Sequence, residues 1–241
     1  TQFKSDLLSM VNHELRTPLT SIITFAQISR EACDPANEHD RRSWEEIEKN
    51  SRILLNMINN MLDIARSDAG GMRANCEPMD LGDVAASVKG TMAPLARKYE
   101  VSFSTKVASD VPLVNGDYEK TTRMLENLAS NAIKFTPDGG SIELRVAYDA
   151  EARVVTLSMV DDGIGIAPED QARIFERFVQ VDSTSTRKYN GSGLGLALVR
   201  EYGDMQGFAV SVESELGRGS RFVITIPASA IVGEIEGEDD V

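Results

Sequence analysis

The chain has only two cysteines among its 241 residues, no long apolar run, and fewer basic than acidic residues. Cys33 and Cys76 lie far apart and fit neither a zinc-binding spacing nor a disulfide framework. No apolar stretch approaches the roughly 18 residues that suggest a membrane span, and no signal peptide is visible. With 25 basic and 38 acidic residues the net charge is -13, which argues against a nucleic-acid-binding surface. We therefore expect a cytoplasmic protein that binds no nucleic acid and, in this region, contacts no membrane.

Residues 1–69 have the three-and-four spacing of apolar residues that is typical of helices, with a break around Pro35. Two helices of about 30 residues would form a hairpin with one apolar face. About 70 residues in this shape cannot build an adequate core alone. We therefore expect a second copy of the chain to complete a dimeric four-helix bundle.

A glycine-containing break at 68–71 separates this hairpin from residues 72–230, which have a mixed pattern of helices and strands. Helices are predicted over 81–99, 117–135 and 194–205, and strands over 101–107, 141–148, 154–160, 208–213 and 220–226. This order predicts an α/β sandwich, a mostly antiparallel sheet with helices on one face. Residues 231–241 form an acidic tail that we expect to be solvated.

One of the two histidines, His13, lies on the polar side of an amphipathic helix. The predicted buried stripe of this helix consists of Leu8, Val11, Leu15, Leu19 and Ile22. His13 therefore faces solvent, and the carboxylate of Glu14 is close enough to orient or deprotonate its imidazole. A lone histidine of this kind is usually an ordinary surface residue, as we expect for His39 in a polar segment predicted as a loop.

The helix predicted over 117–135 carries two stripes. Its buried stripe consists of Met124, Leu125, Leu128, Ala132 and Phe135. Asn127, Asn131 and Lys134 lie beside it, at the edge between core and solvent. Amide oxygens suit Mg²⁺, and a lysine can balance phosphate charge, but for these residues taken alone surface hydrogen bonding is the commoner explanation.

Two glycine-rich segments follow. Asp161-Asp162-Gly163-Ile164-Gly165 comes directly after a predicted strand, where glycines allow close approach of a ligand. A carboxylate there can accept a hydrogen bond from the adenine amine, although a plain Asp-Gly turn would have the same sequence. Gly191-Ser192-Gly193-Leu194-Gly195 leads into a helix, and backbone amides at such a helix start can hold phosphate.

A polar segment separates the two glycine-rich segments. Residues 168–190 contain Phe175 and Phe178, followed by polar residues that include Arg187 and Lys188. We expect this segment to form a mobile cover that brings cations to the site.

Taken in order, these segments resemble the motifs of bacterial two-component sensor histidine kinases. Residues 13–19 match the H-box, 127–135 the N-box, 161–165 the first glycine box, 174–178 the F-box, and 191–195 the second glycine box. The resemblance covers essentially the whole chain. It implies a dimerisation and histidine phosphotransfer hairpin joined to an ATP-binding domain of the type shared with gyrase, Hsp90 and MutL.

The resemblance implies a role for each matching residue of the hairpin. His13 would accept the phosphoryl group, and Glu14 would act as general base or orient the imidazole. Thr17 lies one helical turn after His13 and would take part in dephosphorylating the receiver.

In the second region, the resemblance implies that Asn131 holds Mg²⁺ with help from Asn127, that Lys134 contacts phosphate, and that Asp161 binds adenine. Phe135 would pack near the nucleotide. The remaining residues expected to shape the pocket and its cover are Gly163, Gly165, Phe175, Phe178, Arg187, Lys188, Gly191, Gly193 and Gly195.

The chain departs from the family pattern at two places. Thr121 stands where the family usually has an apolar residue, and Gln206-Gly207 replaces a commoner Gly-Gly. Both lie outside the motif residues and leave the resemblance intact.

The expected function is Mg²⁺- and ATP-dependent autophosphorylation of His13 in a homodimer, followed by transfer to an aspartate of a response-regulator receiver domain. Dephosphorylation of that receiver is a second expected activity. One alternative is an ATPase of the gyrase, Hsp90 and MutL superfamily, and another is a degenerate kinase that acts as a scaffold. The His13 hairpin and the short cover argue against an ATPase, and the intact motifs argue against a scaffold.

The chain begins without an initiator methionine, so we expect it to be a fragment, for example the cytoplasmic kinase core of a membrane-anchored sensor.

Overall fold

A computed structural model of the chain describes residues 19–32, 38–68, 71–180 and 193–232. The chain divides into two compact units, residues 1–73 and 74–241. Within the described ranges, no helix is long and apolar enough to cross a membrane.

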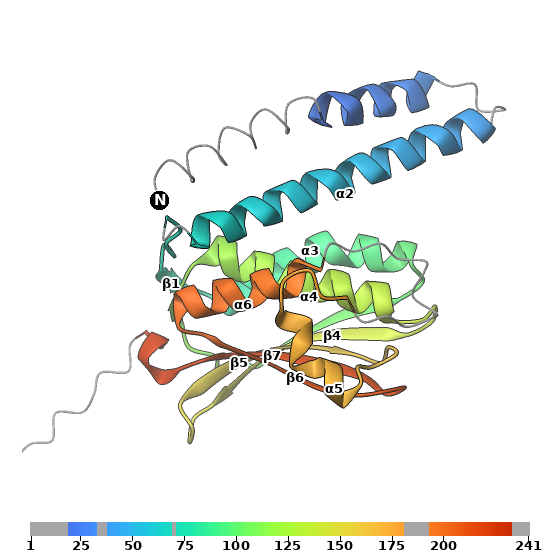
Figure 1. The fold of residues 1–241 in the computed structure, drawn as a ribbon. Helices are drawn as coiled ribbons and strands as arrows, with labels where there is room; N and C mark the ends of the chain where they lie inside the picture. The colour runs from blue at the N-terminus through green and yellow to red at the C-terminus, as the bar shows by residue number, and fades with distance from the viewer. Residues whose placement is uncertain (1–18, 33–37, 69–70, 181–192, 233–241) are drawn as a thin grey trace, which may run out of the picture. The chain divides into compact units, whose positions relative to one another are not determined.

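The first unit contains two helices, as the hairpin prediction requires (Figure 1). Residues 19–32 form one helix, and α2 spans Glu38–Asp68. Glu48 of α2 joins them: its Oε2 pairs with Arg30 at 2.7 Å, and its Oε1 accepts a hydrogen bond from Gln27 at 3.0 Å. His39 is exposed as expected, but it lies in the first turn of α2 rather than in a loop. Acidic residues such as Asp40 stabilise a helix start, which the polar appearance of this segment concealed.

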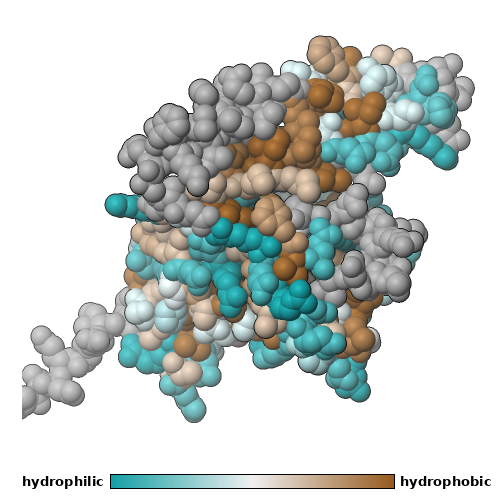
Figure 2. Space-filling view, viewed as in Figure 1, coloured by the Kyte–Doolittle hydropathy of each residue, from teal (hydrophilic) through white to brown (hydrophobic). Residues whose placement is uncertain are grey.

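The helices of the first unit leave much of their apolar surface exposed. Leu19, Ile23 and Ala26 are buried. Ile22, predicted in the buried stripe, is 46% exposed in the single chain, because one partner helix covers only one side of another. Among the described residues of the unit, the large apolar side chains that are exposed are those of Ile22, Phe25, Ile28, Ile47, Leu54 and Met61. Figure 2 shows brown, hydrophobic residues on the surface of this unit.

The second unit is the predicted α/β sandwich (Figure 1). Its helices are α3 (Leu81–Lys98), α4 (Tyr118–Phe135), α5 (Pro168–Gln171) and α6 (Gly195–Gln206), with short 3-10 turns η1 (Arg173–Phe175) and η3 (Ala228–Ala230). Its strands are β1 (Glu77–Met79), β2 (Ser102–Val107), β3 (Val114–Gly116), β4 (Ser141–Asp149), β5 (Val154–Asp161), β6 (Ala209–Glu215) and β7 (Gly219–Ile226).

The main sheet has the strand order β2-β4-β5-β7-β6, and β1 pairs with β3 separately. Only the β2–β4 pair of this sheet is parallel. The helices α3, α4 and α6 cover one face (Figure 1). On β4, Ile142, Leu144 and Val146 point into the core, as the period of two requires. The register pairs Ile142 with Asp161, so the Asp161 side chain lies on the helix-covered face.

The helix α4 packs its predicted apolar stripe against the sheet. Met124, Leu125, Leu128 and Ala132 are buried. Phe135 is only half-buried, contrary to its predicted place in the stripe, because it is the last residue of the helix. The polar stripe predicted beside the apolar one therefore lies along the edge of the core.

Removal of the Leu128 side chain tests this packing. Leu128→Ala leaves a cavity at a fully buried position, so we expect the free energy of unfolding to fall by about 2–5 kcal/mol in denaturant titrations. Ser130→Ala, at an exposed position of the same helix, should change it by less than about 0.5 kcal/mol. Equal effects of the two changes would show that this face of α4 does not carry the core.

Candidate functional site

The carboxylate of Asp161 lies at the end of β5 and is 9% exposed. Its Oδ1 accepts hydrogen bonds from the backbone N–H groups of Gly163, at 3.0 Å, and Ser220, at 3.2 Å. No hydrogen bond from the described residues reaches Oδ2. The fold therefore fixes the orientation of this carboxylate through one oxygen and leaves the other for a ligand.

Burial raises the pKa of Asp161 to about 6. The two backbone hydrogen bonds act in the opposite direction, and the charge of neighbouring Asp162 adds to the rise. Below that pH the side chain is protonated and loses the charge that strengthens a hydrogen bond from an amine.

The first glycine-rich segment, residues 161–165, is hydrogen-bonded to the end of α4. The backbone N–H of Ile164 donates to the carbonyl oxygen of Phe135 at 3.1 Å. A Cβ at Gly163 would lie 2.6 Å from that same oxygen and 2.7 Å from Asp161 Oδ1, so only glycine fits there. Gly165 follows with a φ of 69°.

The polar edge of α4 faces the second glycine segment. Asn127, Asn131 and Lys134 are all half-buried, as their predicted place at the edge requires. The amide nitrogen of Asn127 donates to the Arg123 carbonyl at 3.0 Å, and a Cβ at Gly195 would lie 3.2 Å from Asn127 Oδ1. The two glycine segments thus meet the same helix, one at Phe135 and one at Asn127.

Lys134 lies beside Phe135, with its Nζ 4.7 Å from the centre of the ring. Burial lowers the pKa of Lys134, because the ammonium loses solvation. A phosphate group at this position would offset that loss with its negative charge.

The two phenylalanines of the predicted cover lie in different surroundings. Phe175 is buried, packs edge-on against Phe222 with ring centres 6.3 Å apart, and has the Arg200 guanidinium 5.2 Å from its ring centre. Phe178 is 61% exposed, with a φ of 64°, and its N–H donates to the Gly193 carbonyl at 2.9 Å. Phe175 therefore anchors the start of the cover to the sheet, and Phe178 joins it to the second glycine segment. A nucleotide contact by either stays a prediction.

Six of the predicted site residues lie outside the described residues: His13, Glu14, Thr17, Arg187, Lys188 and Gly191. Within the described ranges, no group of three or more His, Cys, Asp or Glu side chains could hold a metal ion. A magnesium ion at the edge of α4 would therefore depend on amide oxygens and on oxygens of the ligand.

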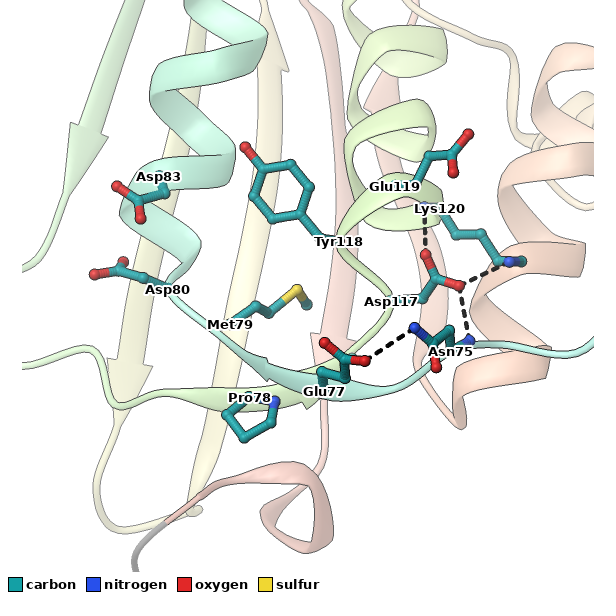
Figure 3. Close-up of a pocket in the computed structure, with 11 residues that line it drawn as sticks. Asn75, Glu77, Pro78, Met79, Asp80, Asp83, Asp117, Tyr118, Glu119 and Lys120 are labelled. Atoms are coloured by element: carbon teal, nitrogen blue, oxygen red, sulfur yellow. Dashed lines mark hydrogen bonds and ion pairs between the residues drawn. The ribbon is translucent and has the colours of Figure 1, made fainter.

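Two hollows lie in the second unit. One, of about 450 Å³, adjoins Asp161 and also includes Asp162 and Ser141. The other, of about 530 Å³, lies at the opposite end of α4 from the motif residues, around Asp117 and Lys120 (Figure 3). The smaller hollow is lined largely by residues of the sheet face away from the helices, such as Glu143, Arg145 and Val160, so neither hollow coincides with the polar edge of α4.

The sequence did not reveal two hydrogen-bonding residues, one that orients Asp161 and one that caps α4. Ser220 supplies a hydrogen bond to Asp161 from 59 residues away, and no local pattern marks such a contact. Asp117 is a buried helix cap whose side chain also binds the backbone N–H of Asn75 at 2.9 Å. The position of Asp117 directly before an amphipathic helix was a usable signal for the cap.

Known families match both units. Residues 116–230 match the family described as histidine kinase-, DNA gyrase B-, and HSP90-like ATPase. Residues 3–70 match the His Kinase A (phospho-acceptor) domain. The chain is 33% identical over 236 residues to the circadian input-output histidine kinase CikA of Synechococcus elongatus, covering 97% of this chain and 31% of that protein.

Solved structures agree with these matches. Full-length ShkA in complex with AMPPNP superposes with a TM-score of 0.76 at 31% identity, over 93% of this chain and 46% of that one. The mycobacterial sensor histidine kinase MprB has a TM-score of 0.55 at 30% identity, over 63% of this chain and 97% of the MprB chain. This chain spans 31%, 43% and 15% of the length of three curated relatives, all named as histidine kinases. The chain belongs to the sensor histidine kinases, with a phospho-acceptor region followed by an ATPase-type domain.

Proposed function

We propose that this chain is the kinase core of a two-component sensor: it binds ATP with Mg²⁺, phosphorylates His13, and passes the phosphoryl group to an aspartate of a receiver domain. The observation that carries the proposal is the buried, oriented carboxylate of Asp161 beside a helix edge of amide and ammonium groups. This arrangement follows, in the same chain, a region that matches phospho-acceptor domains. A stand-alone ATPase would need the nucleotide-site carboxylate but not the phospho-acceptor region.

Adenine and phosphates would bind at opposite sides of this site. Asp161 would accept a hydrogen bond from the adenine amine through Oδ2, since its Oδ1 already holds Gly163 and Ser220. Lys134 and the amides at the start of α6 would face the phosphates. The positive end of α6, which begins at Gly195 without a side-chain cap, supports this orientation.

The residues at the α4 edge fit Mg²⁺. The amide nitrogen of Asn127 donates to the Arg123 carbonyl, and its amide oxygen is the atom that suits a hard cation. Asn131 lies one turn further along the same edge. A bound Mg²⁺ would neutralise charge on the phosphates during transfer.

Phosphoryl transfer then needs mainly position and a nucleophile. A nitrogen of the neutral His13 imidazole attacks the γ-phosphorus in line, a nitrogen–phosphorus bond forms, and ADP leaves with the electrons of the broken phosphorus–oxygen bond. Glu14 accepts the proton or hydrogen bond of the other ring nitrogen. Since His13 and Asp161 belong to different units, the units must come together for transfer.

The exposed apolar residues of the helical unit support a homodimer. Six large apolar side chains on two helices are each at least 40% exposed, which is typical of a surface that another chain covers. A second copy would bury them in the four-helix bundle expected from the sequence.

Phosphorylation of His13 is tested with radiolabelled ATP. We expect His13→Gln to abolish acid-labile label on the protein while ATP affinity stays within about twofold, because the imidazole lies outside the nucleotide pocket. Thr17→Ala is the matched control: it should keep the label and slow only dephosphorylation of a phosphorylated receiver. Acid-labile label that persists in His13→Gln would refute the assignment, and release of free phosphate with no labelled protein would indicate an ATPase instead.

Asp161→Asn should weaken ATP binding without lowering the stability of the fold. The variant keeps an acceptor for Gly163 and Ser220 but buries no charge, so we expect an unfolding temperature equal to or above that of the wild type. Between about pH 4 and 6, Asp161 is protonated in the folded protein but ionised in the unfolded chain, because folding raises its pKa. The contribution of Asp161 to the free energy of unfolding therefore falls as the pH rises through this range. ATP should bind at least about tenfold more weakly, since a hydrogen bond to a charged group contributes about 1.5–3 kcal/mol.

A lower unfolding temperature with unchanged ATP affinity would contradict this role of Asp161. Calorimetric titration with ATP and thermal unfolding of the same samples give both values.

The homodimer is tested by replacing Phe25, which is 68% exposed. Light scattering should give the wild type twice the 26.3 kDa mass of one chain. Phe25→Glu should shift the equilibrium toward the single chain, because a carboxylate would be buried without a partner. Asn56→Glu, at an exposed polar position of α2, adds the same charge and should leave the mass unchanged. A wild type that scatters as a single chain at all concentrations would rule out the dimer.

A further inference from the structure

We propose that Gln206 is a positioning residue for the nucleotide site. From the end of α6 it completes the N-terminal cap of α4, and it thereby fixes the relative placement of the two helices that carry Gly195 and Asn127. The inference rests on the proposed role of these helices in binding ATP.

The cap of α4 is incomplete within its own helix. Asp117 caps the helix in the usual way, with its Oδ1 accepting from the backbone N–H of Lys120 at 3.0 Å. In a capping box, a Glu or Gln at the third helical position accepts a hydrogen bond from the backbone N–H of the cap residue. Lys120 occupies that position and has no acceptor, and its ammonium instead pairs with Asp117 Oδ2 at 2.7 Å. The backbone N–H of Asp117 must therefore find its acceptor elsewhere.

Gln206 supplies that acceptor from 89 residues away. Its Oε1 lies 2.7 Å from the Asp117 nitrogen and also accepts from the Thr121 hydroxyl at 3.2 Å. Its amide nitrogen donates to the Tyr202 carbonyl at 3.0 Å and contacts the sulfur of Met124 at 3.8 Å. These four contacts use the whole capacity of a side-chain amide.

The surroundings leave little room for another arrangement. A Cβ at Gly116, directly before Asp117, would lie 3.3 Å from Gln206 Oε1 and 3.0 Å from the Phe208 ring. Thr121 is fully buried. The shortest contact of a Cβ at Gly116, 2.5 Å, would be to the Met79 methyl group, so a side chain at residue 116 would crowd this cap from several sides.

Contacts between α4 and α6 extend from this cap to the nucleotide site. Beyond Gln206, a Cβ at Gly203 would lie 3.5 Å from Met124, and a Cβ at Gly195 would lie 3.2 Å from Asn127. The helices thus meet at three levels, with Gln206 at one end and the start of α6 at the other. Because a helix moves as a stiff unit, loss of the contact at Gln206 would let the start of α6 shift against Asn127.

Thr121 and Gln206 lie at the two places where the chain departs from the family pattern, and no sequence pattern indicates that they form a hydrogen bond with each other. A buried hydroxyl that loses its partner is destabilising, whereas replacing both partners by apolar groups is nearly neutral. The two residues therefore act as a pair. Asp117 connects this pair to the start of the second unit, since its Oδ2 also accepts a hydrogen bond from the Asn75 N–H (Figure 3).

The experiment measures the dissociation constant of AMPPNP with Mg²⁺ for the full chain, well below the unfolding temperature of each variant. Gln206→Met keeps the volume and removes the acceptor, and we expect binding to weaken about fivefold or more. Thr121→Val removes the hydroxyl and should weaken binding less, while Thr121→Ser keeps it and should stay within about twofold of the wild type. The double variant should lose less than the sum of the two single losses.

Val88→Ala is the control for general destabilisation, because Val88 is fully buried on α3, away from this pair. It should lower the unfolding temperature and leave AMPPNP affinity unchanged. The inference is overturned if Gln206→Met binds AMPPNP within about twofold of the wild type, or if Val88→Ala weakens binding as much. A wild type that does not bind AMPPNP at all would instead refute the proposed function.

Discussion

The structure of the second unit is organised around a buried carboxylate. Asp161 ends the central strand β5 on the helix-covered face, where its partner in the register is the core residue Ile142. Buried polar groups are usually fully hydrogen-bonded. Among the described residues, however, only the backbone N–H groups of Gly163 and Ser220 donate to Asp161. Burial raises the pKa of this carboxyl, and the two hydrogen bonds offset the rise only in part. The buried carboxylate of Asp161 thus lowers the free energy of unfolding, and a ligand that donates an amine hydrogen bond to it would offset this loss. Such destabilising groups are typical of binding sites.

The helix α4 connects this carboxylate with the rest of the molecule. One side of the helix builds the core through Leu125 and Leu128, and the edge beside it carries Asn127, which lies against the start of α6. Because both sides belong to one rigid helix, packing of the core sets the position of the polar edge. The cap at Asp117 then fixes the helix at its other end, through Lys120 and Gln206. The site is therefore preorganised by contacts that lie well away from it.

The sequence predicts those parts of the fold that depend on local pattern. The period of α4 identified its buried and polar sides, and the strand before Asp161 placed that residue at a strand end. Three-residue strands such as β1 and β3 show no period and were missed. The hydrogen bonds of Ser220 to Asp161 and of Thr121 to Gln206 join segments 59 and 85 residues apart, which no local pattern encodes. Ile22 shows the converse case: the period of its helix predicted burial, but the second helix of the single chain covers Leu19 and leaves Ile22 46% exposed.

An NMR titration of the side-chain carboxyl carbon of Asp161 tests the proposal that this ionisable group binds the adenine amine. In the nucleotide-free protein the account predicts a pKa of about 6. Saturating ADP should lower that pKa, because an adenine amine that donates a hydrogen bond to the ionised carboxylate favours loss of the proton. A carboxyl that titrates near the ordinary aspartate value without ligand, or whose pKa does not change when ADP binds, would contradict the account.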